Sequence, residues 1–160
     1  VIGKTEGHID QSLFARNILD EKNGPPPEIN LFNEKNNGET LLSLIENNLI
    51  KSAHDVSLGG IITAVAKMCI KGKKGININK PKYLINETEY LFAEDQGRYI
   101  AEINQKDFKK VADILNKNAV HFDQLGTISE NELYINDKTK VTIDELSTSN
   151  KSWLINYMSK

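Results

Sequence analysis

The chain has 160 residues, of which 39% are hydrophobic and 26% charged, and its net charge at pH 7 is −2. Such a length and composition are typical of one globular domain with a real core. Because the charge is nearly balanced and no run of about 18 apolar residues occurs, neither nucleic-acid binding nor membrane spanning is expected.

The first third of the chain is predicted to hold two helices with an extended segment between them. A helix over 8–19 has an apolar stripe, and its members are Leu13, Phe14, Ile18 and Leu19. Residues 20–37 are predicted to be an extended surface segment ending near Phe32, because their three consecutive prolines lack amide donors. A helix over 38–50 follows, and its predicted buried face consists of Leu41, Leu42, Ile45 and Leu49.

The middle of the chain alternates between strands and helices. A short strand or turn is predicted at 51–55, and a helix over 60–71 is expected to stop at Gly72. Its predicted buried residues are Ile61, Ile62, Val65, Met68 and Cys69, the last as an unreactive buried thiol. A half-buried strand over 75–79 and a short helix over 86–91 complete this part.

The last third begins with a strand over 98–103 and the clearest amphipathic helix, over 105–117, which Asn104 is expected to cap. This helix is expected to bury one stripe, made of Phe108, Val111, Ala112 and Leu115. Strands are predicted near 120–128, 132–136 and 139–143. The strand–helix–strand segment from Arg98 to Ile128 resembles half of a ferredoxin-like motif.

These elements predict an α/β (α+β) fold with a mixed sheet, built as a single domain over 1–160 with no internal boundary. Residues 144–160 are expected to form a C-terminal tail whose Trp153, Leu154 and Tyr157 pack back on the domain. The start at Val1, without an initiator Met or a signal peptide, leads us to expect a segment of a longer polypeptide.

A glycine-rich segment from Gly3 to Ser12 leads into the first predicted helix. Glycines let a backbone approach a ligand closely, and a helix N-terminus suits a phosphate group. The spacing is not that of a P-loop, and the plainer interpretation is a helix entry capped by Asp10 or Ser12. The candidate ligand-supporting residues here are Gly7, His8, Gln11 and Ser12.

A second polar turn, over 53–60, also ends on a helix start. A hydrolase triad is rejected, because close neighbours in a turn rarely reach its geometry, and the turn lacks the further His or Cys of a metal site. The alternatives are a structural turn and a phosphate or nucleotide contact. The candidate residues are His54, Asp55, Ser57, Gly59 and Gly60.

A third polar turn, over 91–99, separates an apolar helix end from an apolar strand. Glu94 and Gln96 are suited to hydrogen-bond a ligand, and the planar fork of Arg98 is suited to a carboxylate or phosphate. The equal alternative is a solvated turn in which Arg98 pairs with Glu94 or Asp95. The candidate residues are Glu94, Asp95, Gln96 and Arg98.

Four motifs occur in order: Gly7-His8-x-x-Gln11-Ser12, Pro25-Pro26-Pro27, His54-Asp55-Val56-Ser57-x-Gly59-Gly60 and Leu91-Phe92-x-Glu94-Asp95-Gln96-Gly97-Arg98-Tyr99. In order and spacing the chain resembles the last domain of the large-subunit phosphoribosylformylglycinamidine synthases, of the aminoimidazole ribonucleotide synthetase superfamily. The closing Trp153-Leu154-x-x-Tyr157-Met158 is similar as well, so the resemblance covers essentially the whole chain. Leu58 departs from the family, where a small or acidic residue is usual.

The resemblance implies a C-terminal domain of an ATP- and glutamine-dependent ligase of purine biosynthesis in the cytoplasm. It implies a structural, nucleotide-supporting half-site with no catalytic residue and no metal ligand, in which ATP and magnesium are bound elsewhere in the full enzyme. The implied partners are N-terminal ATP-binding domains of the same polypeptide, a glutaminase subunit and a small accessory subunit. The isolated chain is expected to be an inactive monomer.

Two alternatives stay open at this point. One is a related superfamily enzyme, such as selenophosphate synthetase, thiamine-monophosphate kinase or the hydrogenase maturation dehydratase. The other is a stand-alone scaffold that binds a phosphate-bearing ligand or a partner domain. The sequence upstream of Val1 discriminates the first from the synthase, and calorimetry with ADP and ATP tests the second.

Overall fold

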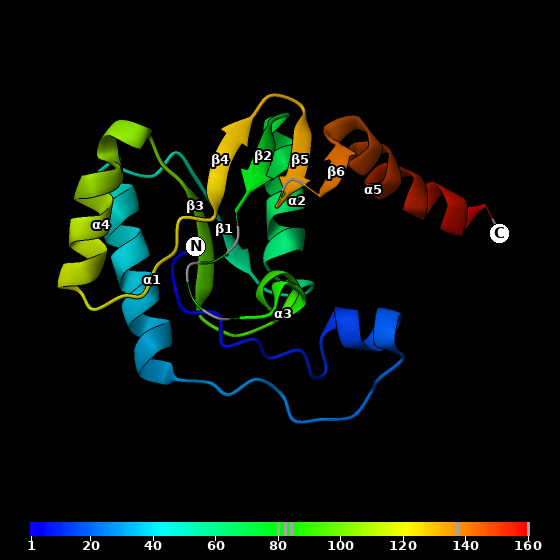
Figure 1. Cartoon of the computed structure of the whole chain (residues 1–160), viewed down its shortest axis with the longest axis horizontal. Coiled ribbons are helices and arrows are strands. Elements are labelled where there is room, and N and C mark those ends of the chain that lie inside the picture. The colour runs from blue at the N-terminus through cyan, green and yellow to red at the C-terminus, as the bar shows by residue number, and fades with distance from the viewer. Residues whose placement is uncertain (80, 82, 84, 137, 160) are drawn as a thin grey trace. The chain divides into compact units, whose positions relative to one another are not determined.

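The computed structural model describes residues 1–79, 81, 83, 85–136 and 138–159, and confirms a mixed α/β fold (Figure 1). The chain divides into two compact units, one of Val1–Ala64 with Pro81–Gln124 and one of Val65–Lys80 with Leu125–Lys160. The single domain over 1–160 stays a prediction, because this division does not show that either unit folds alone. Among the described residues no helix has the length and apolar character needed to cross a membrane.

A two-stranded sheet forms the centre of the first unit. Strand β1 (Ser52–Val56) pairs antiparallel with β3 (Arg98–Glu102), so that Val56 lies opposite Arg98. The start of the chain lies beside β3, since the Ile2 N–H donates to the Tyr99 carbonyl at 2.8 Å and the Ile2 carbonyl accepts the Tyr99 N–H at 2.9 Å. Ile2 also forms an isolated bridge with Phe122, on the segment that follows α4 (Phe108–Lys117).

The segment from Arg98 to Ile128 keeps the arrangement expected for half of a ferredoxin-like motif as far as Phe122, where the chain returns beside the N-terminal segment. The strand predicted near 120–128 is shorter, since β4 spans Gly126–Ser129, and β3 and β4 belong to different sheets. Ile2 bridges Tyr99 of β3 and also Phe122, so the N-terminal segment lies between β3 and the returning chain, as the split β-α-β unit of that motif requires.

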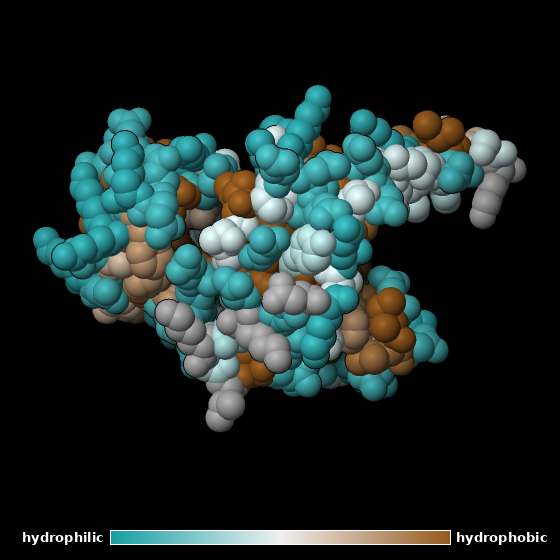
Figure 2. Space-filling view, turned by 45° about the horizontal axis from the view of Figure 1, so that its top comes forward, coloured by the Kyte–Doolittle hydropathy of each residue, from teal (hydrophilic) through white to brown (hydrophobic). Residues whose placement is uncertain are grey.

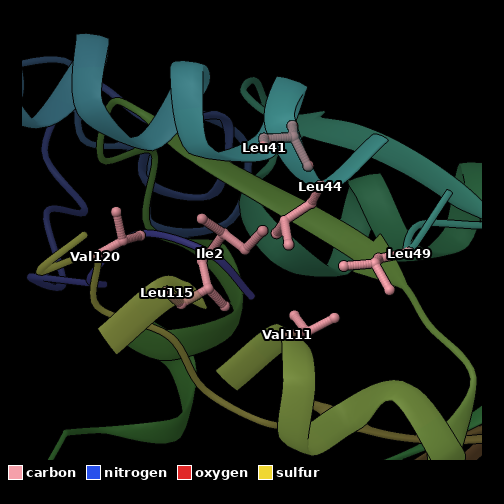
Figure 3. Packing of buried hydrophobic residues seen from close by; sticks show 7 residues of the cluster. All are labelled: Ile2, Leu41, Leu44, Leu49, Val111, Leu115 and Val120. Atoms are coloured by element: carbon pink, nitrogen blue, oxygen red, sulfur yellow. The ribbon is translucent and has the colours of Figure 1, made fainter. Parts of the chain in front are cut away.

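Helices α1 (Leu31–Glu46) and α4 enclose the hydrophobic core of the first unit together with the N-terminal segment. Figure 3 shows the side chains of this core pointing toward one another from these elements. The buried members are Ile2, Leu41, Leu44, Leu49, Val111, Leu115 and Val120. The stripe predicted on 105–117 is therefore confirmed at Val111 and Leu115, whereas Phe108 and Ala112 are half-buried.

The prediction for α1 is wrong in its start and in part of its buried face, although Leu41 and Leu49 are buried as predicted. The helix begins at Leu31, where the Asn30 side chain accepts the Asn33 N–H at 3.0 Å, so residues 31–37 of the segment predicted to be extended are helical. The buried residues follow the spacing i, i+3, i+4, i+7, and they are Asn37, Thr40, Leu41 and Leu44. Leu42 and Ile45, which the apolar pattern placed inside, are 59% and 42% exposed.

Two polar residues on the buried face caused this error. The Asn37 amide donates to the Gly97 carbonyl at 2.9 Å, and the Thr40 hydroxyl accepts from the Asn118 amide at 3.2 Å. Burial of a polar side chain is tolerated when it finds such partners. Because Gly97 and Asn118 lie far along the chain, apolar periodicity did not reveal this face.

The first predicted helix is much shorter than 8–19. Only one π-helical turn, η1, spans Ala15–Leu19, because Gln11 adopts a positive φ of 63° that interrupts a helix. Its predicted apolar stripe is largely at the surface, with Leu13, Ile18 and Leu19 39%, 69% and 47% exposed, and Figure 2 shows hydrophobic surface there. The prediction that Asn104 caps the helix over 105–117 is also wrong. The Asn104 side chain accepts no backbone N–H, and its amide donates instead to the carboxylate of Asp107, the last residue of the short helix η2 (Gln105–Asp107), at 3.2 Å.

The second unit contains a four-stranded mixed sheet in the order β4-β2-β5-β6. Strand β2 (Gly75–Ile78) pairs antiparallel with β4 and parallel with β5 (Glu132–Ile135), which pairs antiparallel with β6 (Thr139–Thr142). Helix α2 (Gly60–Gly72) begins in the first unit and continues into the second. It is confirmed within one residue of its predicted end, and the short helix α3 (Glu87–Phe92) of the first unit is confirmed equally closely.

Cys69 is buried in α2, as predicted, and is 7% exposed. Removal from water raises the pKa of its thiol to about 11, because burial disfavours the thiolate. A thiol in this state is unreactive at neutral pH, which agrees with a packing role.

The C-terminal tail forms a complete helix, α5 (Ile143–Met158). A capping box starts it, in which Thr142 Oγ1 accepts the Glu145 N–H at 3.2 Å and the Glu145 carboxylate accepts the Thr142 N–H at 2.9 Å. The prediction that Trp153, Leu154 and Tyr157 pack back on the domain is wrong, since they are 66%, 56% and 65% exposed. Lys160, the last residue of the predicted tail, lies outside the described residues.

Replacement of Leu44 by alanine is expected to lower the free energy of unfolding by about 3 kcal/mol, because the side chain is fully buried and leaves a cavity. Leu42→Ala on the same helix is the matched control, with an expected change below about 0.5 kcal/mol. Urea unfolding of the 160-residue chain followed by circular dichroism measures both. Equal losses would contradict the buried face described for α1.

Candidate functional site

The three polar turns of the sequence meet at the side chain of Glu94. Its Oε1 accepts the Gly59 N–H at 2.7 Å and the Leu13 N–H at 2.8 Å, and the Glu94 N–H donates to the His8 carbonyl at 3.1 Å. One half-buried residue after α3 thereby ties the glycine-rich segment and the turn before α2 to the third turn. The structure thus brings the three segments into one cluster.

Asp95 organises the glycine-rich segment. Its Oδ2 accepts the N–H groups of Glu6 and Gly7 at 3.0 and 3.1 Å, and its Oδ1 accepts the His8 N–H at 3.1 Å. Successive amides that converge in this way form a concave anion-binding nest. The anion here is the buried carboxylate of the chain itself, so these three amides, in a segment considered for phosphate binding, are already bound.

Arg98 lies behind this nest and is only 1% exposed. Its guanidinium donates to the Thr5 hydroxyl at 2.9 Å, to the Ala93 carbonyl at 2.7 Å and to the Asp95 carbonyl at 3.1 Å. Burial lowers the pKa of Arg98, and the nearby Asp95 charge opposes this shift. The pairing of Arg98 with Asp95 that one interpretation expected is present, with Nη1 3.8 Å from Asp95 Oδ2, but the turn is not solvated there, because Arg98 is buried and its planar fork is engaged within the protein.

Gly60 allows the start of α2 to lie against the third turn. It has a φ of 69°, and a Cβ there would stand 2.6 Å from the Leu91 carbonyl oxygen and 2.7 Å from that of Ala93. No other residue type fits this contact without moving the backbone. The glycine pair of the second motif therefore has a packing role, and the Gly60 N–H donates to the Ser57 carbonyl at 3.0 Å.

His8, Gln11 and Ser12 act within the first segment. Ser12 is fully buried, and its hydroxyl accepts the Ala15 N–H at 3.1 Å, which agrees with the capped helix entry. The Gln11 amide donates to the carbonyls of Lys22 and Gly24 at 2.8 and 3.1 Å. A His8 ring nitrogen lies 2.9 Å from the Pro25 carbonyl, so these residues hold the extended segment that follows η1.

The remaining candidate residues lie at the surface and do not join the buried cluster. Asp55, Ser57 and Gln96 are exposed, and the half-buried His54 contacts its neighbour, with Nδ1 2.6 Å from the Asp55 carbonyl oxygen. Leu58, beside them, is 63% exposed. These side chains are therefore accessible to solvent.

Thr5 is the buried site residue that sequence reasoning missed. It is 2% exposed and accepts the hydrogen bond from Arg98 across 93 positions of the chain. Its only local signal was a place between Gly3 and Gly7, and its partner is set by the tertiary fold.

A metal site is not evident in the part of the chain that the structure describes, where no three His, Cys, Asp or Glu side chains gather around a common point. A shallow hollow of about 440 Å³ lies along α4 and includes none of the candidate residues. Its lining consists of Lys106, Lys109, Lys110, Asp113, Ile114 and Lys117.

Comparison with known proteins gives one family and a consistent set of relatives. Residues 5–138 match the family described as AIR synthase related protein, C-terminal domain. The phosphoribosylformylglycinamidine synthase subunit PurL of Pelagibacter ubique is 69% identical over 158 residues, which are 99% of this chain and 22% of that protein. The protein of the same name from Bartonella quintana is 35% identical over 160 residues, 100% of this chain and 22% of its own length.

Solved structures with the same fold come from Thermotoga maritima. PurL complexed with FGAR has a TM-score of 0.65 at 23% identity and covers 74% of this chain and 21% of that one. PurLQS has a TM-score of 0.65 at 22% identity with coverages of 88% and 24%, and PurL complexed with ATP has 0.58 at 20% identity with 68% and 20%. The chain therefore spans about a fifth of the proteins it matches.

Asp95→Asn is expected to destabilise the chain by about 3 kcal/mol, because an amide group accepts at only one atom and turns its NH₂ toward a backbone N–H. The exposed Asp113→Asn on α4 is the control, with an expected change below about 0.5 kcal/mol. Chemical denaturation reports both values. An Asp95→Asn variant with the stability of the unchanged chain would show that the three backbone N–H groups do not need a full carboxylate.

Glu94→Ala is expected to cost about 2 kcal/mol, because the amides of Leu13 and Gly59 lose their shared acceptor. Glu94→Gln keeps a carbonyl oxygen at that place, so most of the stability should return. Hydrogen exchange of the Gly59 and Leu13 amides locates the effect. Equal stability of the two variants would mean that the shared oxygen does not hold the turns together.

Proposed function

Because the chain belongs to the AIR synthase related protein, C-terminal domain family, we propose that it is the C-terminal domain of a phosphoribosylformylglycinamidine synthase. The observation that carries this proposal is the 69% identity to the Pelagibacter ubique PurL over 99% of the chain. The parent enzyme converts formylglycinamide ribonucleotide to formylglycinamidine ribonucleotide in purine biosynthesis, with ATP and glutamine, in the cytoplasm.

The role proposed for this domain is to hold a nucleotide-supporting half-site in shape. Glu94, Asp95 and Arg98 form its buried frame, and their contacts with the first and second turns support this assignment. The same frame includes Gly7, His8, Gln11, Ser12, Gly59 and Gly60. The surface side chains of His54, Asp55, Ser57 and Gln96 are the groups that reach a ligand held by a companion domain.

The chemistry itself is assigned to other parts of the polypeptide. ATP activates the amide oxygen of the substrate, ammonia displaces the phosphate group, and the products are the amidine, ADP and phosphate. The donor set described here does not fit magnesium, because its carboxylates do not gather and Asp95 is engaged by backbone amides. We propose that magnesium is bound together with ATP by the ATP-binding domains of the full enzyme.

The proposed partners are the N-terminal ATP-binding domains of the same polypeptide, a glutaminase subunit and a small accessory subunit. The printed name PurLQS of the Thermotoga maritima structure supports an assembly of several subunits around a protein of this family. This chain covers 22% of the Pelagibacter ubique protein, which supports the proposal that the parent polypeptide has further domains. No observation favours a different superfamily enzyme or a stand-alone scaffold.

The purified 160-residue chain is expected to release no ADP with formylglycinamide ribonucleotide, ATP, magnesium and ammonium. The polypeptide from the complete reading frame is expected to turn over in the same coupled assay. Turnover by the isolated chain would contradict the supporting role. An inactive complete polypeptide, tested with its glutaminase and accessory subunits, would contradict the enzyme assignment.

A further inference from the structure

One stripe along α5 is apolar at its two ends, with Ser147 and Asn150 between them, and only its beginning is covered. Residues spaced at i, i+3, i+4, i+7, i+10, i+11 and i+14 lie on one face of a helix. On α5 they are Ile143, Leu146, Ser147, Asn150, Trp153, Leu154 and Tyr157. Ile143 is 4% exposed and the next two are half-buried, whereas the stripe beyond them is open.

The open half of this stripe, with Met158 beside it, is here termed the α5 surface: Trp153, Leu154, Tyr157 and Met158. These side chains are between 56% and 75% exposed, and Figure 2 shows apolar side chains standing at the end of this helix. The rings of Trp153 and Tyr157 are already stacked, with centroids 5.6 Å apart and planes inclined by 11°. Neighbouring apolar and aromatic side chains of this kind mark interaction sites on proteins.

The composition of the α5 surface favours a permanent partner. Its four side chains carry no charge, whereas interfaces that open and close are more polar. The charged and polar residues of the same turns lie on the other faces of the helix, among them Lys151, Ser152 and Asn156. Such a surface therefore fits a partner that stays bound to the chain from its synthesis onward.

The comparisons indicate where this partner lies. The match to the family stops at residue 138, before α5, while the match to the Pelagibacter ubique protein covers 99% of the chain and therefore extends into this helix. The chain is 22% of that protein, so most of the polypeptide lies outside the 160 residues. A domain of the same polypeptide is present at high effective concentration, which an independent subunit is not.

We propose that the α5 surface docks on another domain of the same polypeptide, one that precedes Val1. This inference rests on the proposed function, in which the chain is the last domain of a longer enzyme. Burial of the Trp153 and Tyr157 rings would supply the centre of the contact, and Leu154 and Met158 would fill its border. The helix then joins the last domain to the body of the enzyme.

Photo-cross-linking in the complete polypeptide tests the docking. Leu154→benzoylphenylalanine places a cross-linker on the α5 surface, and Asn156→benzoylphenylalanine on the polar face of the same turn is the control. We expect the first to cross-link to peptides that precede Val1 and the second to give at least fivefold less of that product. Cross-links to a second copy, to another subunit, only within the 160 residues, or to nothing would each overturn the proposal.

A second set of substitutions tests the anchor rings. Trp153→Ala with Tyr157→Ala should lower the Leu154 cross-link at least fivefold, whereas Ile155→Ala, which removes a 69% exposed side chain off the stripe, should leave it within twofold. Equal yields in both variants would overturn the role of the rings. The amidation assay is separate: an active polypeptide without the cross-link overturns only the docking, and an inactive one with it overturns only the proposed function.

Discussion

The buried carboxylate of Asp95 is the contact on which the candidate site depends. It accepts three successive backbone N–H groups from the glycine-rich segment, and the Arg98 guanidinium lies behind it at 3.8 Å. A buried charge is stable only when it is paired and hydrogen-bonded, and these partners meet that need. Since Arg98 also binds Thr5 and Ala93, the charge pair fixes the first and third turns as one body.

This arrangement changes how the polar motifs are understood. Glycines and amides that resemble a phosphate cradle in sequence form a cradle for an internal anion, and Glu94 does the same for the amides of Leu13 and Gly59. The conspicuous residues of the motifs are therefore mostly architectural. Of the candidate residues, Asp55, Ser57 and Gln96 stay exposed at the surface.

Both units display apolar groups at their surface that a chain of this size does not cover by itself. In the first unit they lie around η1 and the start of α1, where Ile18 and Phe32 are 69% and 76% exposed. In the second unit they lie on α5. This pattern agrees with a chain that spans about a fifth of its relatives, since inter-domain faces become surface when one domain is considered alone.

The sequence by itself determined the elements whose signals are local. Helix α2 with Gly72 at its end, the stripe of α4 and the burial of Cys69 follow from apolar periodicity and helix-end chemistry, and the ordered motifs indicated the family. Only the tertiary structure decided the rest, because its causes lie far along the chain. The buried Asn37 amide on α1 donates to the Gly97 carbonyl, Ile2 lies between β3 and the segment at Phe122, and the buried Arg98 guanidinium donates to the Thr5 hydroxyl. A polar residue carries no local sign of whether a distant partner will bury it.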